Sequence, residues 1–328
     1  MGGESDAWWE GFKTRTHGSG GTISVPHDLA KKAAQTLGEA EGTLAAIADR
    51  SNWLAFDPRS FGTLPAPVGG NNLGNEFRAQ GDKLPALLAK HQGRVRSMRE
   101  TFVLADARYK SSEAHSANWF QRLEPAPKSV GDGLLTSGGS DGPRSDVPDI
   151  AGVPFTLGRR GESLSLKLSR DQISPNEIDY VDGAALWWGD LYRLGQTIDA
   201  GSVYKAAENW LWLHSEVDKL RHELLPLSWT VFEGWTGVGE RSGAKAAESA
   251  FGRYKEDLEA VADSMWVMGF QLATAAGWLA ATVPLMPQTP LPPVGFESAV
   301  FQARANYNAH YLAGFLATKV PVLSEGAR

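Results

Sequence analysis

The chain has 328 residues, of which 42% are hydrophobic, and this is enough to bury a core in one large or two modest domains. Its 32 basic and 38 acidic side chains give a formal charge of −6, which excludes a global positive field, so we expect no nucleic-acid partner. The absence of cysteine excludes disulfides, thiolate metal sites and cysteine nucleophiles.

The N-terminal residues lack the pattern of a secretory leader. Residues 1–25 are rich in Gly, Ser and Thr around Trp8 and Trp9 and show no sustained period, which predicts a mobile arm. They also lack a charged start followed by an apolar run. We therefore expect a protein that is either cytoplasmic or exported to the cell envelope or the medium without a cleaved signal peptide.

Two apolar stripes predict a first helical hairpin over residues 26–122. Apolar residues spaced 4, 4, 3, 4 and 3 apart predict a helix from about Asp28 to Arg50, and the Pro- and Gly-rich stretch 57–72 predicts a connecting loop. A second stripe, with spacings that alternate between 4 and 3, predicts a helix of about 40 residues, or about 60 Å. Its members are Leu84, Leu88, His91, Val95, Met98, Phe102, Ala105 and Tyr109.

Residues 123–173 have the composition of a linker. They are rich in Pro, Gly, Ser and Asp and too poor in apolar side chains to offset the entropy of ordering, which predicts a flexible segment. Within it, the alternation of Ser and Leu from Ser163 to Leu168 is compatible with a small β-hairpin.

A second hairpin is predicted over residues 174–284. Residues 174–177 place serine at a helix cap, proline at the first helical position and glutamate three residues after the cap. They predict a helix that starts there and continues to about Phe232, with breaks at Gly189, Gly195 and Gly201.

The partner of that helix carries the most regular period of the sequence. Apolar residues from Phe251 to Leu279 are spaced alternately 3 and 4 apart, after a predicted turn at Glu233–Gly237. A series of prolines that begins at Pro284 ends the helix, because proline removes a backbone donor and clashes with the preceding turn. Residues 285–328 are then predicted to form a Pro-rich turn and a last amphipathic helix, about Phe296 to Lys319.

A W-x-G motif lies at the predicted bend of the second hairpin. Gly237 supplies the backbone freedom of a tight turn, and the indole of Trp235 can cap the bundle. With 12 Trp and 36 Gly in the chain, chance matches are expected, and W-x-G also begins at Trp9 and at Trp187. Position distinguishes Trp235, because it alone lies at a hairpin turn.

A Y-x-x-x-E motif ends the long second helix. Tyr109 and Glu113 are four residues apart, so they project from one helical face. Tyr204 and Glu208 repeat the spacing inside the second hairpin.

A helical hairpin that ends in Y-x-x-x-[D/E], then a flexible linker, then a longer hairpin that turns at W-x-G, resembles the EspB-like, fused PE–PPE-like substrates of type VII (ESX) secretion. The match covers about Val25 to Thr282. The resemblance implies a mostly α, elongated bundle of two long antiparallel hairpins, PE-like (26–122) and PPE-like (174–284). It also implies that Trp235 and Gly237 join Tyr109 and Glu113 in a bipartite export signal.

The same resemblance implies a function. It implies export through an actinobacterial ESX apparatus, ring-like homo-oligomerisation, association with anionic phospholipid and a non-enzymatic structural role outside the cell. The chain departs from the pattern in lacking a long Pro-rich acidic tail, which affects the expected processing and membrane behaviour. The alternatives are a generic helical bundle with Trp and Tyr in its core, a pore-forming or membrane-lytic helical protein, and the targeting subunit of a larger secreted toxin system.

Residues 265–283 contain no charge over about one bilayer-spanning length. Small residues recur there every four positions, at Gly269, Ala273, Gly277 and Ala281, which permits close approach of another helix. Three interpretations stay open: a helix buried inside the bundle against the Trp-rich stretch 187–212, an oligomer interface, and membrane insertion.

Signals for catalysis are poor, and we expect a non-enzyme without cofactor or metal. The Gly-rich segment 237–245 fits neither the dinucleotide fingerprint nor the P-loop, and it follows a predicted helix instead of a strand. His214 and His222 lie two helical turns apart, where solvation or packing is the more ordinary role.

A cluster of basic residues lies on the long second helix. It consists of Lys90, Arg94, Arg96 and Arg99. Such a cluster is usually the solvated face of a helix, and it is also suited to anionic lipid headgroups.

Overall fold

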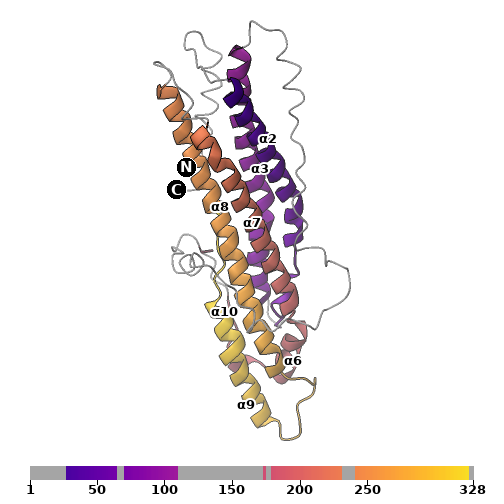
Figure 1. The fold of residues 1–328 in the computed structure, drawn as a ribbon. Coiled ribbons are helices and arrows are strands. Elements are labelled where there is room, and N and C mark those ends of the chain that lie inside the picture. Colours follow the sequence, from indigo (N-terminus) through magenta and orange to yellow (C-terminus); the bar gives the residue numbers. More distant parts are fainter. Residues whose placement is uncertain (1–26, 65–69, 110–172, 175–178, 231–240, 325–328) are drawn as a thin grey trace.

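Helix dominates the described part of this protein. The structure, a computed structural model, describes residues 27–64, 70–109, 173–174, 179–230 and 241–324. Helix accounts for 82% of these residues, and within them β-pairing is limited to isolated bridges (Figure 1). The mostly α class predicted from sequence is therefore confirmed. The predicted arm, 1–25, and almost all of the predicted linker, 123–173, lie outside the described residues.

The helical elements have the following bounds. They are α2 (His27–Arg50), η1 (Ser51–Leu54), η2 (Pro58–Ser60), α3 (Gly70–Tyr109), η4 (Gly183–Ala185), α6 (Trp188–Thr197), α7 (Ala200–Thr230), α8 (Arg241–Thr282), η5 (Val283–Leu285), α9 (Glu297–Asn306), η6 (Tyr307–Leu312) and α10 (Ala313–Ala317).

α2 and α3 pack side by side and run in opposite directions (Figure 1). In the second half of α2, the Glu41 carboxylate lies 2.7 Å from the Arg96 Nε and 3.1 Å from the Arg99 Nη1. Just beyond the end of α2, Leu54 of η1 lies against Gly81, near the start of α3. Rising residue numbers in one helix therefore meet falling numbers in the other.

α7 and α8 form a second pair of oppositely directed helices. The His214 Nδ1 lies 2.9 Å from the Ala262 carbonyl oxygen, and about two turns further along α7 the Arg221 Nη1 lies 3.6 Å from the Glu259 carboxylate. The prolines after Thr282 end α8 as predicted, with Val283–Leu285 forming a short 3₁₀ turn.

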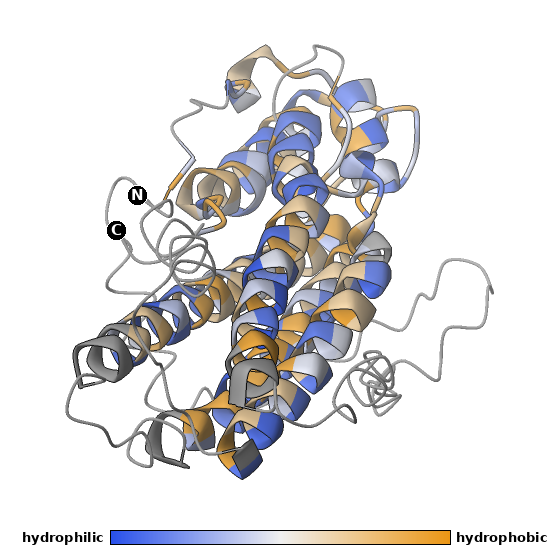
Figure 2. Cartoon of the chain, turned by 90° about the horizontal axis from the view of Figure 1, so that it is seen from above, coloured by the Kyte–Doolittle hydropathy of each residue, from blue (hydrophilic) through white to orange (hydrophobic). Residues whose placement is uncertain are grey.

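The hydrophobic core lies between these helices. Apolar stripes of α2, α3, α7 and α8 merge in one cluster, and Figure 2 shows hydrophobic residues concentrated where the long helices face one another. α2 also contacts α7, where the Arg50 guanidinium lies over the Trp212 ring at 5.5 Å from its centre. The largest fully buried side chains include Trp210, Tyr254 and Phe77.

The C-terminal elements η6 and α10 cover the last part of α8, while α9 packs against α6. The Trp278 Nε1 donates to the Thr318 Oγ1 at 3.0 Å, and the Tyr311 ring meets the Trp278 ring edge-on at 5.4 Å. The Tyr311 hydroxyl donates to the Phe61 carbonyl at 2.8 Å. The sequence predicted one helix here, and the structure inserts a π-helical turn, Tyr307–Leu312, within it.

Gly70 allows the start of α3 to approach Phe61 and Tyr311 closely. A Cβ on Gly70 would lie 2.5 Å from the Phe61 carbonyl oxygen and closer still to the Tyr311 hydroxyl. Only glycine therefore fits at the first residue of α3.

The helix predicted to start at Ser174 was wrong in its position. Residues 175–178 lie outside the described residues, and Asp179–Asp182 are not helical; α6 begins at Trp188. The Ser174 backbone N–H donates to the Val320 carbonyl at 2.8 Å, and its hydroxyl donates to Glu76, so both groups serve tertiary contacts instead of a helix cap.

The break inside this region also differs from the three glycines that were predicted. It falls at Ile198–Asp199, between α6 and α7. The Asp199 carboxylate accepts from the Ser202 backbone N–H at 3.0 Å, which is the usual role of a helix cap. Gly189, Gly195 and Gly201 all lie inside helices.

Candidate functional site

The side chains of the four residues of the predicted export signal lie outside the part of the chain that the structure describes. Tyr109 is the last residue of α3, and its side chain is outside the described part of the chain, as are Glu113, Trp235 and Gly237. The surrounding helix ends are described. Figure 1 shows that α3 ends, α7 ends and α8 begins at the same end of the bundle.

The small-residue stripe of α8 divides into two halves with different surroundings. Gly269 and Ala273 are buried. A Cβ on Gly269 would lie 2.7 Å from the Leu211 Cγ and 3.1 Å from the Ala207 carbonyl oxygen, so this glycine lets α7 approach within the same chain. For this half, the interpretation as a helix buried inside the bundle is the one that the contacts support.

The second half of the stripe faces outward. Gly277 is half-buried, and among the described residues nothing lies within 4 Å of a Cβ built on it. Ala281 is exposed. These residues continue a helical face, which we call the α8 outer face, that also contains Trp266, Phe270 and Thr274.

The α8 outer face carries no charge and includes an aromatic pair. The Trp266 and Phe270 rings stack with their centres 5.5 Å apart, and both are half-buried. A helical face that combines stacked rings with small residues admits a second helix at close range. Within the described residues, α8 is the one helix long and apolar enough to cross a membrane, but half of its most apolar stretch is buried in the bundle.

A layer of polar side chains is buried between the two helix pairs. The Arg94 Nη1 of α3 donates to the Asp257 Oδ2 of α8 at 2.8 Å, with side chains only 3% and 10% exposed. One helical turn away, the His91 ring lies 5.8 Å from the Tyr254 ring, centre to centre. We call these four residues the buried polar layer.

The basic cluster on α3 is only in part the solvated face that the sequence suggested, because the Arg96 side chain is 53% exposed whereas that of Arg94 is buried. Arg94 is buried against Asp257, and Arg96 and Arg99 are both engaged by the buried Glu41 carboxylate. Lys90 is exposed. The sequence did carry a signal for the layer, because His91 occupies a position of the apolar stripe.

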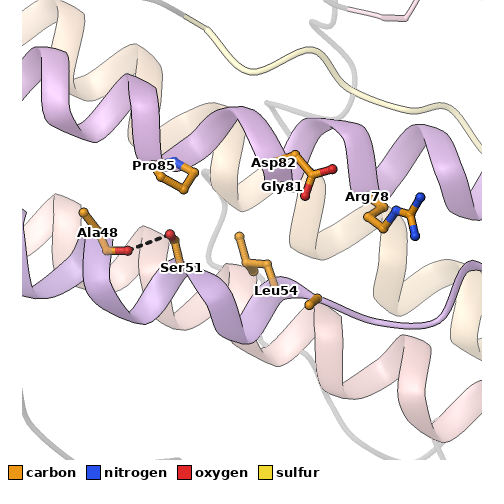
Figure 3. Close-up of a pocket in the computed structure, with 8 residues that line it drawn as sticks. Ala48, Ser51, Leu54, Arg78, Gly81, Asp82 and Pro85 are labelled. Carbon is orange, nitrogen blue, oxygen red and sulfur yellow. Dashed lines mark hydrogen bonds between the residues drawn. The ribbon is translucent and has the colours of Figure 1, made fainter.

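A hollow of about 270 Å³ lies between the end of α2 and α3 (Figure 3). It is lined by Ala48, Ser51, Leu54, Ala55, Arg78, Gly81, Asp82 and Pro85. Ser51 is buried, and its hydroxyl donates to the Ala48 carbonyl at 2.6 Å. The charged side chains Arg78 and Asp82 are exposed, so the hollow has no buried charge with which to fix a ligand.

Comparisons with known proteins do not assign the chain to a family. No protein-family model, curated protein or solved structure matches it.

Large apolar side chains lie exposed at the end of the bundle opposite to the end of α3, and they were not predicted from the sequence. They are Trp187, Leu291, Val294, Phe296 and Phe301. They lie on or beside a connection, 283–296, that contains no charged residue. Large contiguous patches of exposed apolar groups mark surfaces that contact other molecules, whereas single exposed apolar residues are ordinary.

Groups for chemistry are sparse in the described residues. No three His, Asp or Glu side chains there lie close enough to hold a metal ion. His214 and His222 each approach a backbone carbonyl, of Ala262 and of Asp218; His214 is half-buried, and His222 is exposed.

Proposed function

We propose that this chain is a non-enzymatic substrate of type VII (ESX) secretion that works outside the cell or in its envelope as a structural, oligomer-forming protein associated with phospholipid. In this proposal α2 and α3 are the PE-like hairpin, and α7 and α8 are the PPE-like hairpin. Its partners are the secretion apparatus and further copies of the chain.

One observation carries the export part of the proposal. A bipartite signal requires Tyr109 and Trp235 to meet, although 126 positions separate them in the sequence. The end of α3, which holds Tyr109, lies at the same end of the bundle as the two helix ends that flank residues 231–240. The helix directions therefore support a combined signal at that end.

The α8 outer face supports the oligomeric part. It is uncharged, it contains the open Gly277 and Ala281, and it presents a ready-made aromatic pair. A surface helix of a monomer normally places charged residues on its outward face, so this face fits a second copy of the chain.

Cell fractionation tests the export proposal. Wild type, Trp235→Ala and Tyr109→Ala are expressed in an actinobacterial host with a working ESX system, with Trp187→Ala as control, because exposed Trp187 belongs to another W-x-G sequence. We expect wild type and the control in the medium and both signal variants inside the cell in folded form. Equal amounts of all four in the medium would refute the bipartite signal, and retention of all four inside the cell would refute the export role.

Light scattering tests the oligomeric proposal. Gly277→Leu places a large side chain on the α8 outer face without an internal clash, and we expect a lower mass in solution. Gly93→Leu is the matched control, since the surroundings of Gly93 on α3 are equally open in the described residues. An unchanged mass for Gly277→Leu would remove this face from the proposal.

A pore-forming role is the second candidate, favoured by the length and hydropathy of α8. Dye release from vesicles separates it from the first. Release that Gly277→Arg abolishes supports insertion of α8, because an arginine near the bilayer centre costs about 3 kcal/mol on insertion scales. No release at any protein concentration excludes it.

A further inference from the structure

The buried polar layer is an expensive feature in a helical core. No group in the described residues hydrogen-bonds the Nδ1 or Nε2 of His91 or the hydroxyl of Tyr254. Both residues are fully buried. An unsatisfied buried polar group costs about 1–3 kcal/mol, so an apolar pair at these positions would hold the helices together more firmly. The layer therefore weakens the junction of α3 with α8.

Positive charge surrounds the His91 ring. Burial, followed by the charges of Arg94 and Lys90, lowers the pKa of His91 to about 3. From α8 the facing groups are Tyr254, whose pKa burial raises above its ordinary value, and Asp257, which Arg94 engages. The buried carboxylates of the other two long helices in the described residues already have cations: Glu41 of α2 has Arg96 and Arg99, and Glu216 of α7 has Lys219.

We propose that the buried polar layer is an acid-sensitive latch between the two helix pairs. An imidazolium at His91 has no partner for its two N–H donors and lies beside the Arg94 guanidinium, so it is stable only when water reaches it. Water reaches it when α3 separates from α8. Mild acid therefore favours an opened chain in which each helix pair stays intact.

The latch has a defined response to pH. In the opened chain His91 regains its ordinary pKa of 6.5, while the closed chain resists protonation down to about pH 3. Opening thus takes up one proton in that window. The ratio of opened to closed chains should rise about tenfold for each pH unit below 6.5.

Distances between spin labels measure the opening directly. The chain has no cysteine, so Gly93→Cys on α3 and Gly252→Cys on α8 introduce two unique labelling sites. Both lie within three residues of the buried polar layer, and neither Cβ meets a described atom within 4 Å. In the full chain, we expect one short distance at about pH 7.5. As the pH falls, a second, longer distance should appear, and the ratio of its population to that of the short one should rise about tenfold per pH unit, as uptake of one proton requires.

Substitutions of His91 test its role. His91→Phe keeps a ring against Tyr254 and His91→Gln keeps a neutral polar group, so at least one variant should fold, and neither can take up the proton. We expect both to stay closed over the whole range, whereas His222→Gln, a change at an exposed histidine of α7, should open like wild type. Label distances that stay constant in wild type overturn the proposal, as does equal acid opening in the His91 variants.

Discussion

The ion pair between Arg94 and Asp257 gives the most informative stability experiment. Both side chains are almost fully buried and 2.8 Å apart, on helices of different pairs. Asp257→Leu leaves the Arg94 charge buried without its carboxylate, and we expect a loss of about 3–5 kcal/mol in the free energy of unfolding. Arg94→Met leaves the Asp257 charge buried without its guanidinium, and we expect a loss of similar size in the free energy of unfolding.

The double variant distinguishes a buried pair from ordinary packing. With both charges replaced by apolar side chains of similar volume, no desolvation penalty remains, and we expect a stability equal to that of wild type or up to about 4 kcal/mol higher. Urea unfolding followed by circular dichroism supplies all four values of the cycle.

A more exposed ion pair is the matched control. Glu259→Gln removes the carboxylate that lies 3.6 Å from Arg221 between α7 and α8, and we expect a loss below about 1 kcal/mol because water screens that pair. The reasoning is refuted if Asp257→Leu is as mild as the control, or if the double variant loses as much as the sum of its parts.

Three further substitutions test the packing. Tyr311→Phe removes the donor to the Phe61 carbonyl and should lower the free energy of unfolding by about 1–3 kcal/mol in urea unfolding, with no change meaning that another group satisfies the carbonyl. Gly70→Ala forces a Cβ against backbone at 2.5 Å and should lower the thermal midpoint by several degrees, since overpacking costs about 1–3 kcal/mol; a higher midpoint would contradict the close approach. Gly269→Ala meets the Leu211 side chain at 2.7 Å and should cancel the roughly 1 kcal/mol that alanine normally adds to a helix, so clear stabilisation by calorimetry would show that α7 and α8 are further apart.

The long helices were predictable because their apolar residues recur every three or four positions over many turns. Such a period predicts an amphipathic helix, and α8 extends to Thr282, two residues before the first proline of the series. The helix start at Ser174 was not predictable in the same way. A capping sequence is four residues long, and tertiary bonds from Ser174 to Val320 and Glu76 outweigh it.

The sequence allowed us to predict which residues belong to the candidate surfaces, but not which side chains they contact. Gly269 and Gly277 belong to the same four-residue repeat of small residues, yet Gly269 faces α7 and Gly277 is open. The way in which α7 and α8 cross decides which turns of α8 are covered. Arg94 was assigned to a solvated face for a similar reason. Its partner Asp257 is 163 positions away, and nothing in the local sequence announces it.

The bond from Tyr311 to Phe61 spans 250 positions, and the Leu323 backbone N–H reaches the Gln80 side chain over 243. During synthesis, the Phe61 carbonyl and the Gln80 side chain therefore lack these partners until the last residues of the chain are made. Contacts between residues so far apart in the sequence form slowly, so these two bonds to the first helix pair are completed late although that pair is made first. A chain cut before α9 would keep all four long helices and lose the segment that holds their ends together.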